Sequence, residues 1–477
     1  MENKRDVKEL KRPELLLFAW ADVFGGAQSV LAVLYLVFLT NILNISPAWA
    51  GAVVMISKVW DAVSDPMMGI LSDNTRHALG RRRPYLILGG ALLIVSLVLL
   101  WLPVRFESHL ARVLYVTVTY LFYSTVSTII SVPYSSMSTE ITGDFSLRNR
   151  VNMTRLIFSL LSTALCTLIP TLLFSRLTKG AMTLNAFYLI ISLGFGAFFA
   201  IPVVLAGFFA KERIPCPEEK SSFSLHTFML PLKVRAFRTL LGLYLAQTIT
   251  LDIVSAVVLY YGMYVVPGIS STVFLGIFMG MQLLLFPVLM KLVDRVPKPK
   301  IYRFGLPLSL LGAAGIAFFP SHAQPVLLYL IVGLTALGFA GAQTMNWIMF
   351  PDVVDIGELS LKQRITGSFS GMMTFVRKAS SAIAIFLVGV ALSMAGFIRP
   401  TSETPMPLQP EGTQLAIRLI ILLAFLLLMG GAWYLAGRFA LSPELSMKVK
   451  SLLESRKAGG LTPQQSEEEK GVLEKLG

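Results

Sequence analysis

The chain has 477 residues, of which 55% are hydrophobic and 14% are charged, and its formal net charge is +14. Soluble proteins carry about 25% charged residues, so this composition excludes a soluble globular protein and indicates an integral membrane protein. The positive charge does not indicate nucleic-acid binding, because the basic residues separate apolar stretches instead of forming one polar domain. Of the two cysteines, Cys166 lies in an apolar run and Cys216 in a charged connection, which argues against a disulfide framework.

The apolar stretches predict about twelve membrane spans, because a crossing helix needs about 20 apolar residues. The start of the chain, up to Arg12, is charged and runs into the first span without a small-residue cleavage signal. We therefore expect the first span to serve as the insertion signal. The predicted spans lie near residues 14–41, 47–72, 84–104, 111–134, 152–175, 185–210, 238–265, 270–293, 301–319, 325–350, 367–396 and 413–439.

Most lysine and arginine residues fall on one side of these spans. Cytoplasmic loops of membrane proteins collect Lys and Arg, so this bias predicts that both termini are cytoplasmic. We expect a multi-pass protein of a bacterial-type inner (cell) membrane. The basic segments on the cytoplasmic side are 4–12, 76–83, 211–238, 291–303 and the tail from Lys448.

Two loops echo each other at corresponding places in the two halves of the chain. The second and eighth predicted spans each end in an acidic residue, Asp73 or Asp294, that is followed by a basic, proline-containing loop. A duplicated six-helix unit would leave such an echo. The alternative is that any helix that ends in the cytosol attracts basic residues.

The whole pattern predicts an all-α membrane protein with twelve transmembrane helices in two six-helix lobes. The tail is rich in Glu, Lys, Ser, Gln and Gly, and we expect it to be mobile. The expected parts are an N-terminal lobe at 1–210, a cytoplasmic connection at 211–237, a C-terminal lobe at 238–440 and the cytoplasmic tail at 441–477.

Two carboxylates, Asp61 and Asp65, interrupt the second predicted span. A spacing of four residues puts both on one helix face. An acid at bilayer depth costs about 2.5–3.5 kcal/mol by the gentler scales, so such acids usually hold a partner or an ion. We predict a site for sodium or a proton, since neighbouring carboxylates raise one another's proton affinity. The alternative is a structural salt-bridge set with Lys58, Arg155 or Lys378.

Five motifs follow one another along nearly the whole chain. They are WDAVSDP from Trp60, GRRRP from Gly80, VPYS from Val132, FPDVVDIGE from Phe350 and FVRKAS from Phe375. Together they closely resemble the glycoside-pentoside-hexuronide:cation symporters of the major facilitator superfamily. The resemblance implies the two-lobed major facilitator fold and cation-coupled transport by alternating access.

The resemblance also implies roles for single residues. Asp61 and Asp65 match the two acids that line the family's cation site. Lys378 matches an intramembrane lysine near that site and would act either as a displaceable counter-ion or as a permanent bridge. Asp22 and Arg155 match residues of the family's sugar pocket.

The pocket departs from the family pattern at two positions, and Ser131 and Ser135 stand where an aspartate and a sugar-stacking tryptophan would be expected. The leading prediction for the cargo is a polar organic solute such as a sugar or glycoside. An amphipathic cargo such as a lysolipid is the alternative, because some relatives carry one. In the C-terminal half, Trp347 could line the cavity or anchor a membrane end. Asp252 could bind cargo or make an interhelical hydrogen bond.

Charged residues that we expect in cytoplasmic loops predict a gate between the lobes, because opposite charges can hold one side shut and separate when the lobes rock. For the basic members the positive-inside rule is an alternative explanation. The gate residues are Asp73, Arg76, Arg82, Glu140, Arg148, Asp352 and Asp355.

No Gly-x-x-x-x-Gly-Lys-Ser/Thr loop occurs, so transport would draw on an ion gradient or on the gradient of the cargo itself. We expect a monomeric transporter without a cofactor, whose partners are a small solute, a cation and lipid. An intramembrane prenyltransferase is a remote alternative, since Asp-x-x-x-Asp carboxylates could hold magnesium on a diphosphate. Such an enzyme would need a second acid cluster that faces the first.

Overall fold

The computed structural model describes residues 10–142, 145–213, 228–293, 295–321, 323–362, 365–400, 406–457 and 462–476. These residues form helices and no β-strand. The chain divides into two compact units. Unit 1 comprises residues 1–223 and 398–407, and unit 2 comprises residues 224–397 and 408–477.

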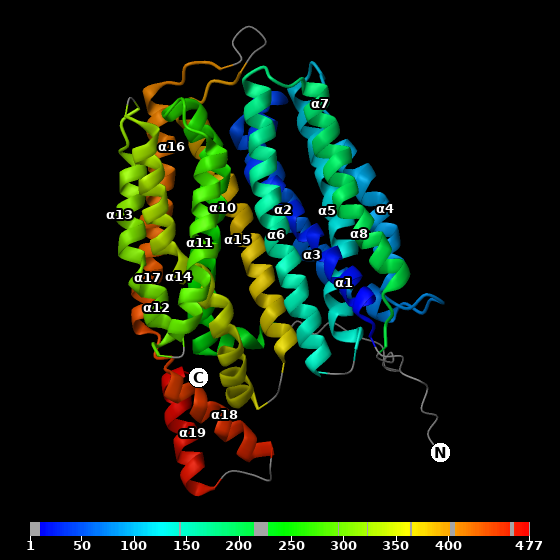
Figure 1. Ribbon diagram of the computed structural model, residues 1–477, viewed down its shortest axis with the longest axis vertical. Helices are drawn as coiled ribbons and strands as arrows, with labels where there is room; N and C mark the ends of the chain where they lie inside the picture. The colour runs from blue at the N-terminus through cyan, green and yellow to red at the C-terminus, as the bar shows by residue number, and fades with distance from the viewer. Residues whose placement is uncertain are drawn as a thin grey trace. The chain divides into compact units, whose positions relative to one another are not determined.

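Unit 1 begins with a helix that changes its winding several times: α1 (Arg12–Trp20), the 3-10 turn η1 (Ala21–Gly26), α2 (Ala27–Val30) and the π-helical turns η2 (Leu31–Tyr35) and η3 (Phe38–Ile42). In the rest of the unit, α4 packs against both α5 and α8 (Figure 1). The helices that follow in unit 1 are α3 (Pro47–Asn74), α4 (Arg83–Leu100), α5 (His109–Glu140), α6 (Phe145–Thr178), α7 (Leu184–Leu189), η4 (Ile190–Gly194) and α8 (Phe195–Phe209).

Unit 2 is built around α10 and α14, which pack against each other and against most of the unit's other helices. Its helices are η5 (Leu230–Lys233), α10 (Arg235–Tyr260), η6 (Tyr261–Val265), α11 (Ser271–Val293), α12 (Lys298–Phe304), α13 (Leu306–Ala317), α14 (Pro325–Leu361), α15 (Thr366–Met394), α16 (Glu411–Leu423), η7 (Ala424–Met429), α17 (Gly430–Arg438), α18 (Pro443–Lys457) and α19 (Pro463–Leu476).

Ten helices of the described residues are long and apolar enough to cross a membrane. The two predicted spans that are not among them lie near 47–72 and 301–319. The first is α3, whose charged side chains lower its hydropathy, and the second is broken at Gly305 into α12 and α13. A Cβ atom on Gly305 would come within 2.3 Å of the Gly338 carbonyl oxygen, so this break accompanies a close approach to α14. Twelve spans remain a prediction.

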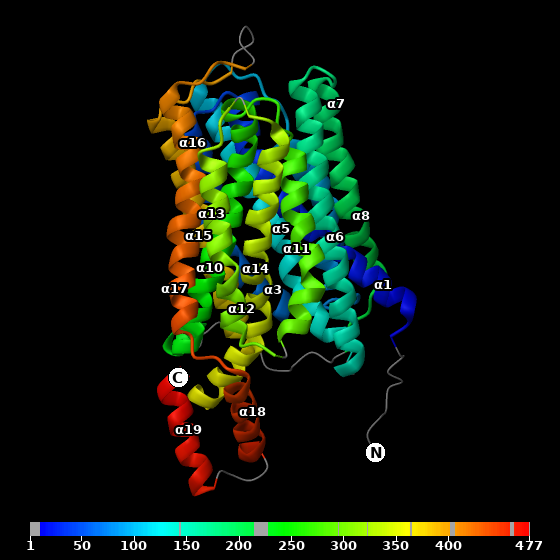
Figure 2. The same cartoon turned by 60° about the vertical axis from the view of Figure 1, so that its left-hand side comes forward.

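The tail contains two helices, α18 and α19, which form a helical hairpin (Figure 2), and its mobility stays a prediction. Both helices contact α14, and Arg456 joins them through an ion pair with Glu469 at 2.7 Å. Arg456 also donates to the Leu359 carbonyl oxygen at 3.4 Å. Five apolar residues of this hairpin are buried, namely Val449, Leu452, Leu453, Val472 and Leu476.

Candidate functional site

The acid pair lies between α3 and α5 of unit 1. Asp61 is only 3% exposed and accepts a hydrogen bond from the Ser124 hydroxyl. Asp65, one turn further along α3, accepts from Thr128 Oγ1 at 2.8 Å. The Ser64 hydroxyl lies 3.3 Å from that same Thr128 oxygen. Two carboxylates of one helix therefore face two hydroxyls of another, in matching steps of four residues.

The hydroxyl face of α5 was not predicted from the sequence. Ser124, Thr125 and Thr128 all point at α3, where Thr125 accepts from the Trp60 indole N–H at 2.9 Å. The available signal was the recurrence of hydroxyl residues at helical spacing in an apolar span. These oxygens, together with the carboxylates, form the kind of all-oxygen set that hard cations bind.

A lysine of α3 also touches the acid pair. The Lys58 ammonium lies 3.3 Å from Asp61 Oδ2 and 3.2 Å from Gln28 Oε1. The alternative prediction, a structural salt-bridge set around the acid pair, is thus met in one part, because Lys58 forms an ion pair with Asp61. Arg155, which the same alternative considered, pairs instead with Asp22.

The two predicted pocket residues Asp22 and Arg155 lie together in unit 1. Arg155 Nε of α6 is 3.2 Å from Asp22 Oδ2 of η1. The close fit of η1 against α6 positions them, because Ser162 donates to the Val23 carbonyl oxygen at 2.6 Å. A Cβ atom on Gly26 would lie 2.2 Å from the Ser162 hydroxyl, so glycine is needed for this approach.

An aromatic side chain that the sequence analysis did not assign completes this cluster. The Tyr134 ring lies 4.5 Å from the Arg155 guanidinium carbon, and its hydroxyl donates to the Phe18 carbonyl oxygen at 2.8 Å. Ser131 and Ser135 precede and follow it on α5. The exposed Ser135 hydroxyl donates to the Val132 carbonyl oxygen within its own helix at 2.9 Å.

Unit 2 contains a second charged cluster. Arg377 of α15 lies 3.7 Å from Asp252 of α10, and Ser381 donates to that carboxylate at 2.5 Å. Of the alternatives for Asp252, an interhelical contact is therefore present. Lys378 follows Arg377 on α15, and its role as a counter-ion remains a prediction.

Polar side chains of α10 and α14 form a buried group near Trp347. Gln247 donates to Gln343, and Asn346 donates to Gln247 at 3.4 Å. Trp347 is 60% exposed and makes an edge contact with Tyr244 at 5.6 Å between ring centroids. The role of Trp347 stays a prediction.

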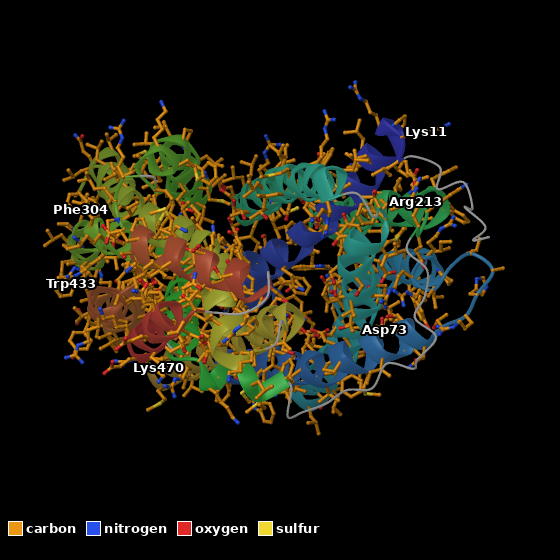
Figure 3. All side chains as sticks on the ribbon, turned by 90° about the horizontal axis from the view of Figure 1, so that it is seen from below. Lys11, Asp73, Arg213, Phe304, Trp433 and Lys470 are labelled. Carbon is orange, nitrogen blue, oxygen red and sulfur yellow. The ribbon has the colours of Figure 1, made fainter. Side chains whose placement is uncertain are left out.

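The predicted gate residues of unit 1 form a network at one end of α3, α4 and α5. Arg81 and Arg82 contact Glu140 at 2.6 and 3.0 Å, and Arg82 also pairs with Asp73. Glu212 was not predicted to take part, yet it accepts backbone N–H bonds from residues 81, 82 and 83 and so caps the start of α4. Figure 3 shows this end of the unit, with Asp73 and Arg213 labelled.

The predicted loop positions of several gate residues are wrong, because Asp73, Glu140, Asp352 and Asp355 lie in the last turns of long helices. In α14 the helix passes through Pro351 and continues to Leu361, although proline commonly marks a helix end.

The remaining gate residues have separate surroundings. Asp352 pairs with Lys298 of the same unit at 2.5 Å. Arg76 is exposed and donates to the Asp73 carbonyl oxygen at 3.1 Å. The side chain of Arg148 lies outside the described residues. Contacts between the lobes remain a prediction.

Comparisons with known proteins match residues 22–442 to the family described as MFS/sugar transport protein. The chain is 26% identical to "Uncharacterized symporter sll1374" of Synechocystis sp., over 91% of this chain and 95% of the relative. It is 24% identical to the glucuronide carrier protein homolog of Escherichia coli, over 84% of this chain and 87% of the relative. It is also 24% identical to the putative glycoside/cation symporter YagG of E. coli, over 77% and 80%.

Solved structures show the same fold. The nucleoside transporter NupG covers 91% of this chain with a TM-score of 0.60 at 13% identity, and the whole NupG chain is matched. A bacterial homolog of the lysosomal transporter Spinster gives a TM-score of 0.62 at 12% identity and covers 90% of this chain and 98% of its own. The protein is therefore a transporter and no prenyltransferase, and its match from residue 22 to residue 442 places it in the MFS/sugar transport protein family.

Proposed function

We propose that this protein is a cation-coupled symporter of a sugar or glycoside that works by alternating access. The single observation that carries the proposal is the acid pair of buried Asp61 and half-buried Asp65, which faces hydroxyl groups of α5 in a chain of transporter fold. Relatives named as a glycoside/cation symporter and a glucuronide carrier homolog support both the coupling and the class of cargo.

The coupling ion is sodium or a proton, held by Asp61 and Asp65. Carboxylate and hydroxyl oxygens suit sodium, a hard cation, and Thr128 and Ser64 lie where they could supplement the carboxylates. Two acids near each other resist burial in a closed cavity unless a cation neutralises them. An ion that favours the closed arrangement shifts the population toward it, which is the physical basis of coupling.

The cargo site is formed by Asp22, Arg155 and the ring of Tyr134. A carboxylate accepts and a guanidinium donates hydrogen bonds, so the pair can engage sugar hydroxyls from both sides. The Tyr134 ring is only 5% exposed and packs against the Arg155 guanidinium, so it would hold that group in position. Ser131 and Ser135 would supply further hydroxyls from α5, and Trp347 would line the cavity from unit 2.

The proposal also assigns roles to a lysine of unit 2 and to the charged helix ends. Lys378 acts as a counter-ion near the cation site, and the charged helix ends that carry Asp73, Arg82 and Asp352 act as the cytoplasmic gate. The protein works as a monomer in the inner membrane, with both termini in the cytoplasm.

The test is the thermal stability of the purified protein against a panel of sugars, glycosides, glucuronides and lysolipids, with sodium or potassium and at two pH values. We expect a sugar or glycoside to raise the melting temperature, and the rise to grow with sodium or with acid. In Asp22→Asn and Arg155→Gln the cargo-induced shift should be lost while the ion-induced shift remains. Stabilisation by lysolipids alone would contradict a sugar cargo, and no ion dependence would contradict coupling.

A further inference from the structure

A pocket of about 430 Å³ lies in unit 2, between the end of α13 and the side of α16. Its apolar walls include Phe318, which is 70% exposed, and Leu415, which is 52% exposed. Its polar groups are the guanidinium of Arg418 and the hydroxyl of Ser321. This volume is within the range of small-molecule sites.

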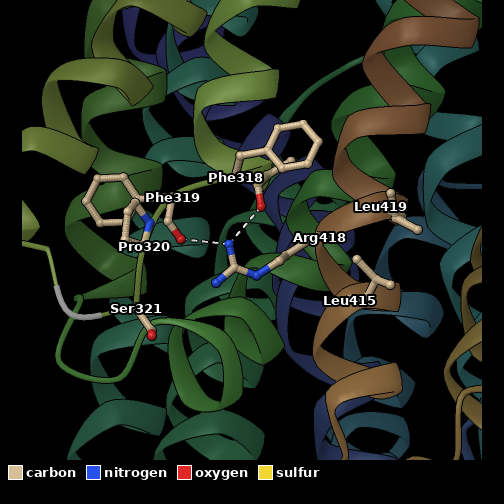
Figure 4. Close-up of a pocket in the computed structure, with 8 residues that line it drawn as sticks. Phe318, Phe319, Pro320, Ser321, Leu415, Arg418 and Leu419 are labelled. Carbon is tan, nitrogen blue, oxygen red and sulfur yellow. Dashed lines mark hydrogen bonds between the residues drawn. The ribbon is translucent and has the colours of Figure 1, made fainter.

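Only one nitrogen of the Arg418 guanidinium donates hydrogen bonds to the protein. Its Nη1 donates to the carbonyl oxygens of Ala317 and Phe319, at 2.8 and 2.6 Å, and so caps the last turn of α13. Figure 4 shows the other nitrogens of the guanidinium turned away from these carbonyl groups. Within the described residues, no hydrogen bond engages Nε or Nη2, and no carboxylate forms a salt bridge with Arg418.

The pocket lies near the start of a candidate membrane span, Glu411–Arg438. Arg418 is seven residues from the start of α16 at Glu411, which is about 10 Å along a helix. The connection from α13 to α14 forms the opposite wall. At such a depth lipid headgroups meet acyl chains, and an arginine without a carboxylate partner gains from an anionic group there.

We propose that this pocket binds an anionic phospholipid, with the headgroup phosphate on Arg418 and Ser321 and an acyl chain against Phe318 and Leu415. A guanidinium suits a phosphate because its N–H groups can form paired, charge-assisted hydrogen bonds. The exposed apolar walls select a lipid phosphate over a free one, since a free anion would leave them uncovered. The inference is independent of the transport cargo.

The test counts lipids bound to the purified full-length protein by native mass spectrometry, with dioleoylphosphatidylglycerol as the probe. Leu415→Glu puts a negative charge beside the phosphate, at an exposed position three residues before Arg418 on the same helix, where the new carboxylate also competes for the guanidinium. Val326→Glu is the matched control, because Val326 is 65% exposed at the start of α14 and does not line the pocket.

We expect Leu415→Glu to weaken the first lipid-binding step about tenfold, which corresponds to about 1.4 kcal/mol, and Val326→Glu to leave it unchanged. Arg418→Gln should weaken it as well, with melting curves reporting any loss of the cap. Equal losses in Leu415→Glu and Val326→Glu would overturn the proposal. So would equal binding of dioleoylglycerol, which lacks the phosphate, or displacement of the lipid by inorganic phosphate, which would identify a soluble anion as the occupant.

Discussion

Variants of Lys58 and Asp61 can distinguish the contribution of Asp61 to protein stability from its contribution to ion binding. Asp61→Asn removes the charge that faces the Lys58 ammonium at 3.3 Å. The lysine side chain is only 12% exposed, so it cannot turn fully to water. An uncompensated lysine within a membrane helix costs about 2.5–3.5 kcal/mol. Gln28 still accepts from this ammonium, which lowers the expected loss to about 1–3 kcal/mol.

The double variant Lys58→Met/Asp61→Asn removes both charges and should regain most of that stability. Both variants should nevertheless lose the stabilisation that sodium gives the parent protein, since each lacks the Asp61 carboxylate. The assay is the melting temperature of the purified proteins in sodium and in potassium, which needs no knowledge of the cargo. A double variant that still responds to sodium would refute the ion-site assignment. A double variant as unstable as Asp61→Asn would refute the electrostatic reasoning.

Three further perturbations test separate contacts. Thr128→Val keeps the side-chain shape but removes the hydroxyl that donates to Asp65, so sodium titrations followed by melting temperature should show about tenfold weaker sodium binding. An unchanged sodium affinity would show that this hydroxyl does not contribute to the ion site. Gly26→Ala should lower the melting temperature because its Cβ would meet α6, whereas Gly280→Ala, with no atom within 4 Å, should not; equal effects would contradict the close packing. Val472→Asp buries a charge on α19 and should expose the tail to limited proteolysis, and unchanged cleavage would show that the hairpin does not depend on the burial of Val472.

The sequence alone determined the class of the protein and much of its local structure. Hydropathy adds up along a continuous stretch, so composition was enough to indicate a membrane protein and to mark ten helices that the structure contains. The spacing of Asp61 and Asp65 fixed their common helix face, because that face follows from the helical repeat. The order of the motifs was enough to indicate the family that the comparisons confirm.

Only the tertiary structure decided which groups meet across helices. Ser124 and Thr128 reach the acid pair because of the rotation of α5 about its axis. This rotation depends on how α5 packs along its whole length, and the sequence of α5 alone does not specify it. The extension of α14 beyond Pro351 and the hairpin of α18 and α19 contact each other across a long stretch of sequence, whereas the local signal at Pro351 favoured a helix end. Local sequence patterns determine where helices form and which residues share a helix face, and the packing of neighbouring helices determines which groups each side chain contacts.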